Sequence, residues 1–156
     1  MGVIALIILV LLIIGPTLLR DDKEYTVWEP KLTNILAGAK IGKGTCIGAF
    51  SEIGKDVIIG KNCKVQAFVF IPRGVSVNDN VFIGPAVTFT NDRYPSSRDY
   101  GKFEQTVIED NVSIGAGSTI RCGVVLHKGC RIGAGSVVTK DVAANTLVYG
   151  NPAREK

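Results

Sequence analysis

An aliphatic residue recurs at every sixth position along most of this chain, and this spacing limits the folds that the chain can adopt. The period is neither the 3.6 residues of an α-helix nor the simple alternation of a hairpin strand. A first run of eight residues closes at Phe89, and a second run in a shifted phase starts at Ile108. The first run comprises Ile41, Ile47, Ile53, Ile59, Val65, Ile71, Val77 and Ile83, and the second comprises Ile108, Ile114, Ile120, Leu126, Ile132 and Val138.

Two further columns follow the same period. A small or β-branched residue stands two positions before each aliphatic residue of the first run, so strand alternation places both on one inward face. Glycine follows many of the aliphatic residues directly, which suits a corner that needs a positive φ or a close backbone approach. Short sides joined by such corners form a prism in which each coil is buried by its neighbours. The sequence therefore predicts an all-β parallel β-helix. These glycines are Gly42, Gly48, Gly54, Gly60, Gly84, Gly115 and Gly133.

The phase of the repeat breaks between Phe89 and Ile108. Ile108 follows Phe89 by nineteen positions, which is not a multiple of six, so part of the segment 90–106 must leave the coil as an extended loop. The segment contains two Tyr, two Arg and two Asp. Because polar and aromatic insertions on rigid scaffolds usually carry function, we expect the active site here, with a plain surface loop as the alternative.

The N-terminal segment 1–24 differs from the repeat. Residues 2–19 carry no charge and are nearly all aliphatic. As a helix they would reach about 27 Å, close to the ~30 Å thickness of a bilayer core. Arg20 and Lys23 follow, and no cleavage site does, so the segment predicts a hydrophobic helix that anchors the protein to the cytoplasmic face of a membrane. A helix buried in an oligomer and an artefact of the chosen start are the alternatives.

Composition excludes one class of partner. The net charge of +4 is spread without a Lys/Arg run, and aromatic residues make up 7% of the chain, which argues against nucleic-acid binding. The four cysteines lack metal-ligand spacing and are read as reduced buried thiols in a cytoplasmic protein.

Residues 31–154 resemble the left-handed β-helix acyltransferases of the hexapeptide-repeat superfamily. Three stretches carry the likeness: CKVQ at Cys63–Gln66, VFIGPAVTFTNDRYP at Val81–Pro95, and AGSVVTKDV with GNPAR between Ala134 and Arg154. The middle stretch is most similar to the N-acetyltransferases that modify nucleotide-linked 3-amino sugars for polysaccharide biosynthesis. The segment 31–156 is thus identified as an acyltransferase domain.

The resemblance implies three hexads per coil, a homotrimer with active sites between subunits, acetyl-CoA as cosubstrate and a nucleotide-linked amino sugar as acceptor. It implies that Asn91 and Asp92 lie at the catalytic centre and that Gln66, Arg93 and Tyr94 bind the sugar. Ala67 stands where relatives have Asn, and Ser96-Ser97 where they have Arg-Ala, so the sugar remains open. The residues implied to line the CoA groove are Gly115, Ala116, Gly117, Gly133, Ala134, Gly135, Val138, Lys140, Asn151, Pro152 and Arg154.

The predicted reaction is attack of the sugar amine on the thioester. A neutral amine needs less base catalysis than a hydroxyl, so positioning and oxyanion contacts would dominate, with Asn91 stabilising the oxyanion and Asp92 orienting the amine. An O-acetyltransferase that uses His127, the single histidine, is the alternative within enzymes; the spacing places His127 at an outward corner. One histidine cannot supply a three-histidine metal site, so no metal is expected. A non-catalytic β-helix scaffold is the second alternative, but it predicts an uninterrupted repeat.

Overall fold

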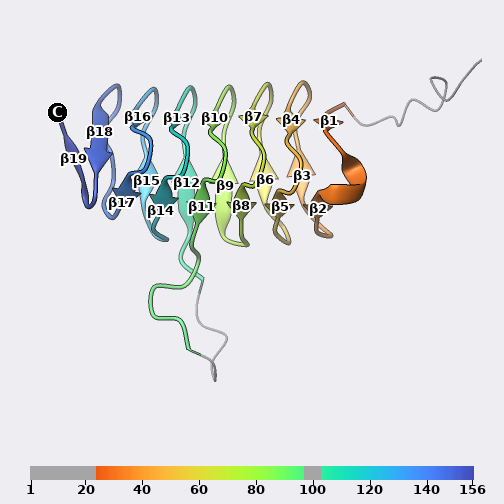
Figure 1. The fold of residues 1–156 in the computed structure, drawn as a ribbon, viewed down its shortest axis with the longest axis horizontal. Helices are drawn as coiled ribbons and strands as arrows, with labels where there is room; N and C mark the ends of the chain where they lie inside the picture. Colours follow the sequence, from red (N-terminus) through yellow and green to blue (C-terminus); the bar gives the residue numbers. More distant parts are fainter. Residues whose placement is uncertain (1–23, 97–102) are drawn as a thin grey trace, which may run out of the picture.

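The computed structural model describes residues 24–96 and 103–156, and in them the chain forms an all-β solenoid of about six turns. Figure 1 shows the coils side by side along the long axis, with β1 near one end and β19 at the other. The predicted N-terminal segment 1–24, with its hydrophobic helix at residues 2–19, lies outside the described residues apart from Glu24. Within the described part of the chain, the one helix is the 3-10 turn η2 (Pro30–Leu32), and no helix is long and apolar enough to span a bilayer.

Three sheets form the sides of the prism, and we call them sheets A, B and C. Sheet A has eight strands: β1 (Thr26–Val27), β4 (Cys46–Ile47), β7 (Lys64–Val65), β10 (Phe82–Ile83), β13 (Ser113–Ile114), β16 (Arg131–Ile132), β18 (Leu147–Gly150) and β19 (Ala153–Glu155). Sheet B has six: β2 (Asn34–Ile35), β5 (Glu52–Ile53), β8 (Phe70–Ile71), β11 (Thr88–Phe89), β14 (Thr119–Ile120) and β17 (Val137–Val138). Sheet C has five: β3 (Lys40–Ile41), β6 (Ile58–Ile59), β9 (Val75–Val77), β12 (Thr106–Ile108) and β15 (Val125–Leu126).

The strand register shows that one coil takes three hexads. Val65 pairs with Ile47 on one side and with Ile83 on the other, each 18 residues away, and these pairings are parallel. Ile83 then pairs with Ile114, 31 residues along, so 13 residues are inserted into one coil. The insertion leaves the prism between β11 and β12, where the sequence predicts the loop (Figure 1). The last pairing, β18 with β19, is antiparallel.

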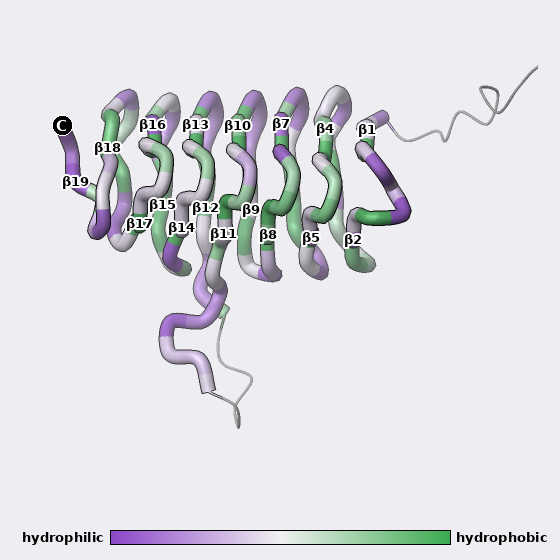
Figure 2. Tube along the Cα trace, viewed as in Figure 1, coloured by the Kyte–Doolittle hydropathy of each residue, from purple (hydrophilic) through white to green (hydrophobic). Residues whose placement is uncertain are grey.

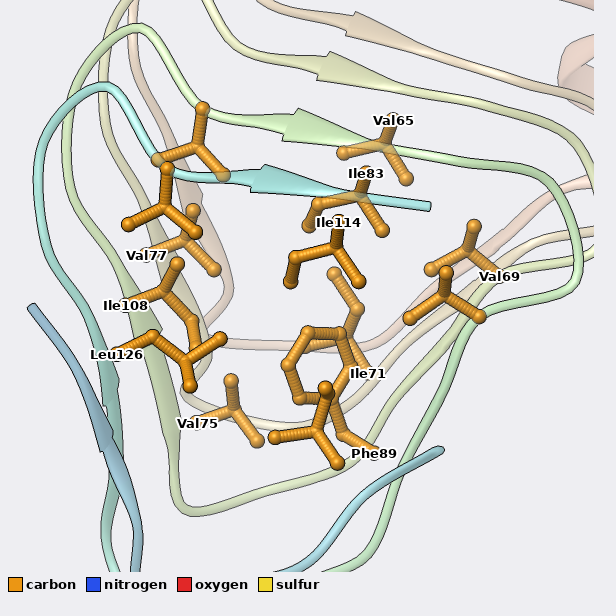
Figure 3. Close-up of a cluster of buried hydrophobic side chains, with 14 of the residues drawn as sticks. Val65, Val69, Ile71, Val75, Val77, Ile83, Phe89, Ile108, Ile114 and Leu126 are labelled. Atoms are coloured by element: carbon orange, nitrogen blue, oxygen red, sulfur yellow. The ribbon is translucent and has the colours of Figure 1, made fainter. Parts of the chain in front are cut away.

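The aliphatic columns fill the prism. Figure 3 shows Ile71, Ile83, Phe89, Ile114 and Leu126 pointing into one interior from the three sides, and all five are 0% exposed. The tube coloured by hydropathy alternates between apolar and polar stretches around each coil (Figure 2). Each fully buried side chain of this size contributes about 1.5–3 kcal/mol. The predicted solenoid is confirmed, and its core is the column read from the sequence.

Glycine meets two different demands at the corners. Gly84, directly after Ile83, has no positive φ, but a Cβ there would lie 2.7 Å from the backbone nitrogen of Ala116 in the next coil. The left-handed conformation falls three residues after the aliphatic position, as at Ala86 (φ 57°) and Gly117 (φ 66°). The positive φ expected of the glycines that directly follow the aliphatic residues is therefore wrong, whereas the close backbone approach is confirmed.

Candidate active site

The predicted site residues lie on different edges of the prism, which we name by the sheets that they join. The AB edge carries Gln66 and the predicted CoA residues 115–117, 133–135 and 151–152. The BC edge carries the insertion, with residues 91–94 at its start. His127 follows β15 and lies on the CA edge. Within one prism, the width of sheet B thus separates these AB-edge residues from the loop, whereas Lys140, which follows β17, lies on the BC edge.

Both stalks of the insertion are tied to the BC corner of the following coil. The hydroxyl of Thr90 accepts the N–H of Cys122 at 2.9 Å, and the hydroxyl of Thr106 accepts the N–H of Gly123 at 3.1 Å. The N–H of Glu104 donates to the carbonyl of Asn91 at 3.1 Å and joins the two stalks. These bonds fix the base of the loop on a rigid corner.

An ion pair closes the loop base. Arg93 Nη2 donates to Glu104 Oε2 at 2.5 Å, and this hydrogen bond raises the pKa of Arg93. The pair lies over Gly123, where a Cβ would fall 2.2 Å from the same carboxylate oxygen. Arg93, predicted in the sugar pocket, is therefore engaged in holding the loop. Sequence reasoning missed Glu104, because a pairing across an insertion of unknown path leaves no periodic signal.

The other loop residues form an exposed turn. Asp92 Oδ1 accepts the N–H of Tyr94 at 2.9 Å, which is an Asx turn. No described residue hydrogen-bonds to the second carboxylate oxygen of Asp92, so that oxygen is available to a ligand. The Tyr94 residue is 83% exposed, so it contacts no pocket of its own subunit.

The AB edge offers an open backbone surface in the C-terminal coils. The N–H of Gly117 donates to Pro85 O at 2.9 Å, and that of Gly135 donates to Ala116 O at 2.8 Å, which stacks these corners in register. No atom lies within 4 Å of a Cβ built on Gly117 or Gly135. Gly150 N–H donates to the Ser136 hydroxyl at 3.2 Å and brings the 151–152 turn to the same edge. An extended ligand could therefore follow this edge without meeting a side chain at either glycine.

A pocket of roughly 230 Å³ at the C-terminal end of the prism brings together Lys140 and Arg154. Both were predicted to bind CoA, and their charges suit its phosphates. Val138 also lines this pocket, but it is 1% exposed and belongs to the core. Its side chain points inward with its column, and its place in the CoA groove stays a prediction.

His127 is paired with a carboxylate. His127 Nδ1 lies 3.1 Å from Glu109 Oε1, and Glu109 Oε2 accepts the N–H of Lys128 at 2.8 Å. The Lys128 hydrogen bond, followed by that of His127, lowers the pKa of Glu109. A carboxylate on Nδ1 leaves Nε2 for a substrate, as in oriented general bases. Sequence reasoning missed Glu109, although its 18-residue separation from His127 equals one coil.

Burial makes two of the four cysteines, Cys63 and Cys130, poor nucleophiles. All four are free, and Cys63, Cys122 and Cys130 are buried. Burial raises the pKa of Cys130 to about 11 and also raises that of Cys63, so both remain protonated thiols near neutral pH.

Two buried polar atoms lack a hydrogen-bond partner within the described residues: Gln66 Nε2 and Arg121 Nε. Gln66 lies on the AB edge and was predicted to contact the substrate. Arg121 lies on the BC edge at the base of the loop, and no pattern in the sequence singled it out. Native proteins rarely leave such donors unpaired, so each marks a place where a ligand could supply an acceptor.

Comparison with known proteins agrees with this geometry. Residues 38–73 and 105–140 match the family described as "Bacterial transferase hexapeptide (six repeats)". A hexapeptide-repeat-containing acetyltransferase from Vibrio cholerae O1 biovar eltor, solved with acetyl coenzyme A, is 31% identical; the match covers 77% of this chain and 70% of that one, with a TM-score of 0.66. The chain belongs to the hexapeptide-repeat acyltransferase superfamily. The predicted family is confirmed.

Curated relatives include both N- and O-acetyltransferases. A dTDP-3-amino-3,6-dideoxy-alpha-D-galactopyranose 3-N-acetyltransferase from Aneurinibacillus thermoaerophilus is 46% identical over 54 residues, which are 35% of this chain and 28% of that protein. A galactoside O-acetyltransferase from Lactococcus lactis subsp. lactis is 40% identical over 78 residues, which are 47% of this chain and 38% of that protein. The matched segments thus span well under half the length of these relatives.

Proposed function

We propose that this protein is an acetyltransferase that moves the acetyl group of acetyl-CoA to the amine of a nucleotide-linked amino sugar. The observation that carries the proposal is the insertion on the BC edge, whose base is fixed by Thr90, Thr106 and the Arg93–Glu104 pair. It presents Asn91 and Asp92 on a rigid support. The Aneurinibacillus relative, by its name, acetylates an amine on a nucleotide-linked sugar, which supports this choice of acceptor.

In the proposed reaction, the neutral amine attacks the thioester carbonyl carbon, and a C–N bond forms. The C–S bond then breaks, and CoA leaves as a thiolate that is protonated to the free thiol. The side-chain amide of Asn91 would donate to the developing oxyanion. The free carboxylate oxygen of Asp92 would orient the amine and accept the proton that it loses. Positioning and electrostatic stabilisation would supply most of the acceleration.

The cosubstrate is proposed to lie along the AB edge. The open corners at Gly117 and Gly135 would accommodate its extended arm, and Lys140 and Arg154 would meet its phosphates. Because the AB and BC edges of one prism are apart, a complete site would form where the AB edge of one copy meets the BC edge of the next. We therefore propose a homotrimer of left-handed prisms with sites between subunits.

A second candidate is an O-acetyltransferase, favoured by the His127–Glu109 pair. A sugar hydroxyl is a poor nucleophile without a base, and His127 is held in the orientation that a base requires. The Lactococcus relative, by its name, acetylates a galactoside on oxygen.

The proposed function is tested by following free-thiol release from acetyl-CoA with the purified protein. The acceptors are nucleotide-linked amino sugars, the matching nucleotide-linked sugars with a hydroxyl in place of the amine, and simple galactosides. Transfer to the amine alone supports the proposal. Transfer to the hydroxyl compounds alone would replace it with the O-acetyltransferase.

Residues 2–19 are proposed to anchor the enzyme to the cytoplasmic face of a membrane, as their length and flanking charges suggest. Cell fractionation tests this idea. Full-length protein found in the soluble fraction without detergent would reject it, whereas a chain that starts at Glu24 should be soluble and active.

A further inference from the structure

Arg121 begins the BC corner that carries the insertion. Its own N–H donates to Val138 O at 3.0 Å and fixes the backbone in the ladder of sheet B. The next two residues, Cys122 and Gly123, hold the two stalks of the loop through the hydroxyls of Thr90 and Thr106. Arg121 therefore lies where the insertion leaves the prism.

No described residue accepts a hydrogen bond from the guanidinium of Arg121. Its Nε is buried without a hydrogen-bond partner, and Arg121 forms no ion pair with a described carboxylate. Two other arginines of the BC edge are paired: Arg73 with Asp56 at 3.8 Å, and Arg93 with Glu104 at 2.5 Å. A buried donor without an acceptor destabilises the free protein, so its retention is explained if a ligand supplies the acceptor.

Three acidic side chains of the BC edge have hydrogen-bond partners other than Arg121. Glu104 binds Arg93, Asp92 Oδ1 caps the N–H of Tyr94, and Asp141 Oδ1 accepts the N–H of Val125 at 2.8 Å. Among the described residues, none of these carboxylates forms an ion pair with Arg121.

We propose that Arg121 binds a phosphate group of the ligand held at the base of the loop. A planar guanidinium with several donors matches phosphate oxygens in charge and geometry. Two sources share this chemistry: the phosphates of CoA and the diphosphate of a nucleotide-linked acceptor. The assignment of the phosphate to CoA or to a nucleotide-linked acceptor rests on the proposed function. The inference that Arg121 binds a phosphate does not, because its guanidinium is unpaired in the free protein.

The test compares the full-length protein in detergent with Arg121→Met and Arg121→Lys by calorimetric titration with coenzyme A and, separately, with thymidine diphosphate. Methionine removes both charge and donors at similar length, and lysine keeps only the charge. Arg121→Met should weaken binding of one probe about tenfold to a hundredfold. Arg121→Lys should restore part of that loss. Arg73→Met, which removes a paired arginine of the same edge, is the matched control and should leave both affinities unchanged.

Thermal unfolding without ligand separates binding from a structural role. Because methionine removes an unpaired buried donor, Arg121→Met should leave the melting temperature unchanged or raise it. If Arg121→Met weakens the binding of coenzyme A alone, Arg121 binds a phosphate of the cofactor. If it weakens the binding of thymidine diphosphate alone, Arg121 binds the diphosphate of the acceptor.

Three results would overturn the proposal: unchanged affinity for both probes, a lowered melting temperature with unchanged affinity, or a wild-type protein that binds neither probe. Wild-type protein that binds through Arg121 but transfers no acetyl group would refute the proposed function and leave this inference standing.

Discussion

Substitution of glycine by alanine at two positions of one corner separates the fold from the proposed cofactor surface. Gly115 and Gly117 belong to the same AB turn, but a new methyl group meets different surroundings at each. At Gly115 the Cβ would lie 2.4 Å from the backbone nitrogen of Ala134. At Gly117 it would meet no atom within 4 Å, and only the φ of 66° opposes it.

The expected magnitudes follow from these contacts. Relief of the Gly115 clash requires the next coil to move by about 1 Å, which stretches the hydrogen bond from Gly115 N–H to Ile132 O, now 2.8 Å. Overpacking of about 1–3 kcal/mol and a lost hydrogen bond of about 1 kcal/mol give roughly 2–4 kcal/mol for Gly115→Ala. Gly117→Ala costs about 1 kcal/mol of backbone strain, since Ala86 already occupies the same turn position at φ 57°.

Denaturant unfolding and steady-state kinetics measure the two effects. Gly115→Ala should lower the free energy of unfolding at least twofold more than Gly117→Ala. Gly117→Ala should keep the fold but raise the KM for acetyl-CoA on the order of tenfold, because the methyl group occupies the proposed cofactor surface. Ala86→Gly is the backbone control and should change the unfolding free energy by less than about 1 kcal/mol. Equal destabilisation by the two alanines would refute the coil-stacking argument, and an unchanged KM in Gly117→Ala would remove CoA from this edge.

Three further outcomes are expected. His127→Ala should lower turnover less than about tenfold, whereas Asn91→Ala and Asp92→Ala should lower it more, since a true general base contributes roughly 10²–10⁴-fold; the reverse order in kinetic assays would favour the O-acetyltransferase. Because the folded pKa of Glu109 is lowered, its carboxylate stabilises the fold above its ordinary pKa of 4.5, and this contribution is lost as the pH falls through the lowered value. The melting temperature of Glu109→Gln should therefore fall less than that of the wild-type protein as the pH is lowered. Identical pH profiles of the melting temperature in the two proteins would contradict this. Ile114→Asp should prevent folding, because it buries an unpaired charge at a 0% exposed position, and a native circular dichroism spectrum would refute the register.

The sequence predicted the repeating core and the place where the repeat is interrupted. The six-residue column located the core and the insertion, because every coil obeys the same steric demand. The Glu109–His127 pair was missed but could have been predicted, since residues 18 apart stack in successive coils. The Arg93–Glu104 pair was not, because the path of an insertion does not follow the repeat. Arg121 was missed for a further reason. A donor can be recognised as unpaired only when the positions of all neighbouring acceptors are known, and these come from the structure.

Because the AB and BC edges of one prism are apart, the proposed active site requires two subunits. Mixed oligomers of two variants test this requirement. If each site takes Gln66 from one copy and Asp92 from its neighbour, Gln66→Ala and Asp92→Ala remove different halves of the same site. In trimers reassembled from equal amounts of the two variants, about a quarter of the sites would combine an intact Gln66 with an intact Asp92. Mixing two nearly inactive proteins should then restore roughly a quarter of wild-type turnover, while each variant reassembled alone should stay inactive. Should the mixture stay as inactive as its parents although native mass spectrometry shows mixed trimers, both residues would serve one subunit, and the edge-to-edge site would be wrong.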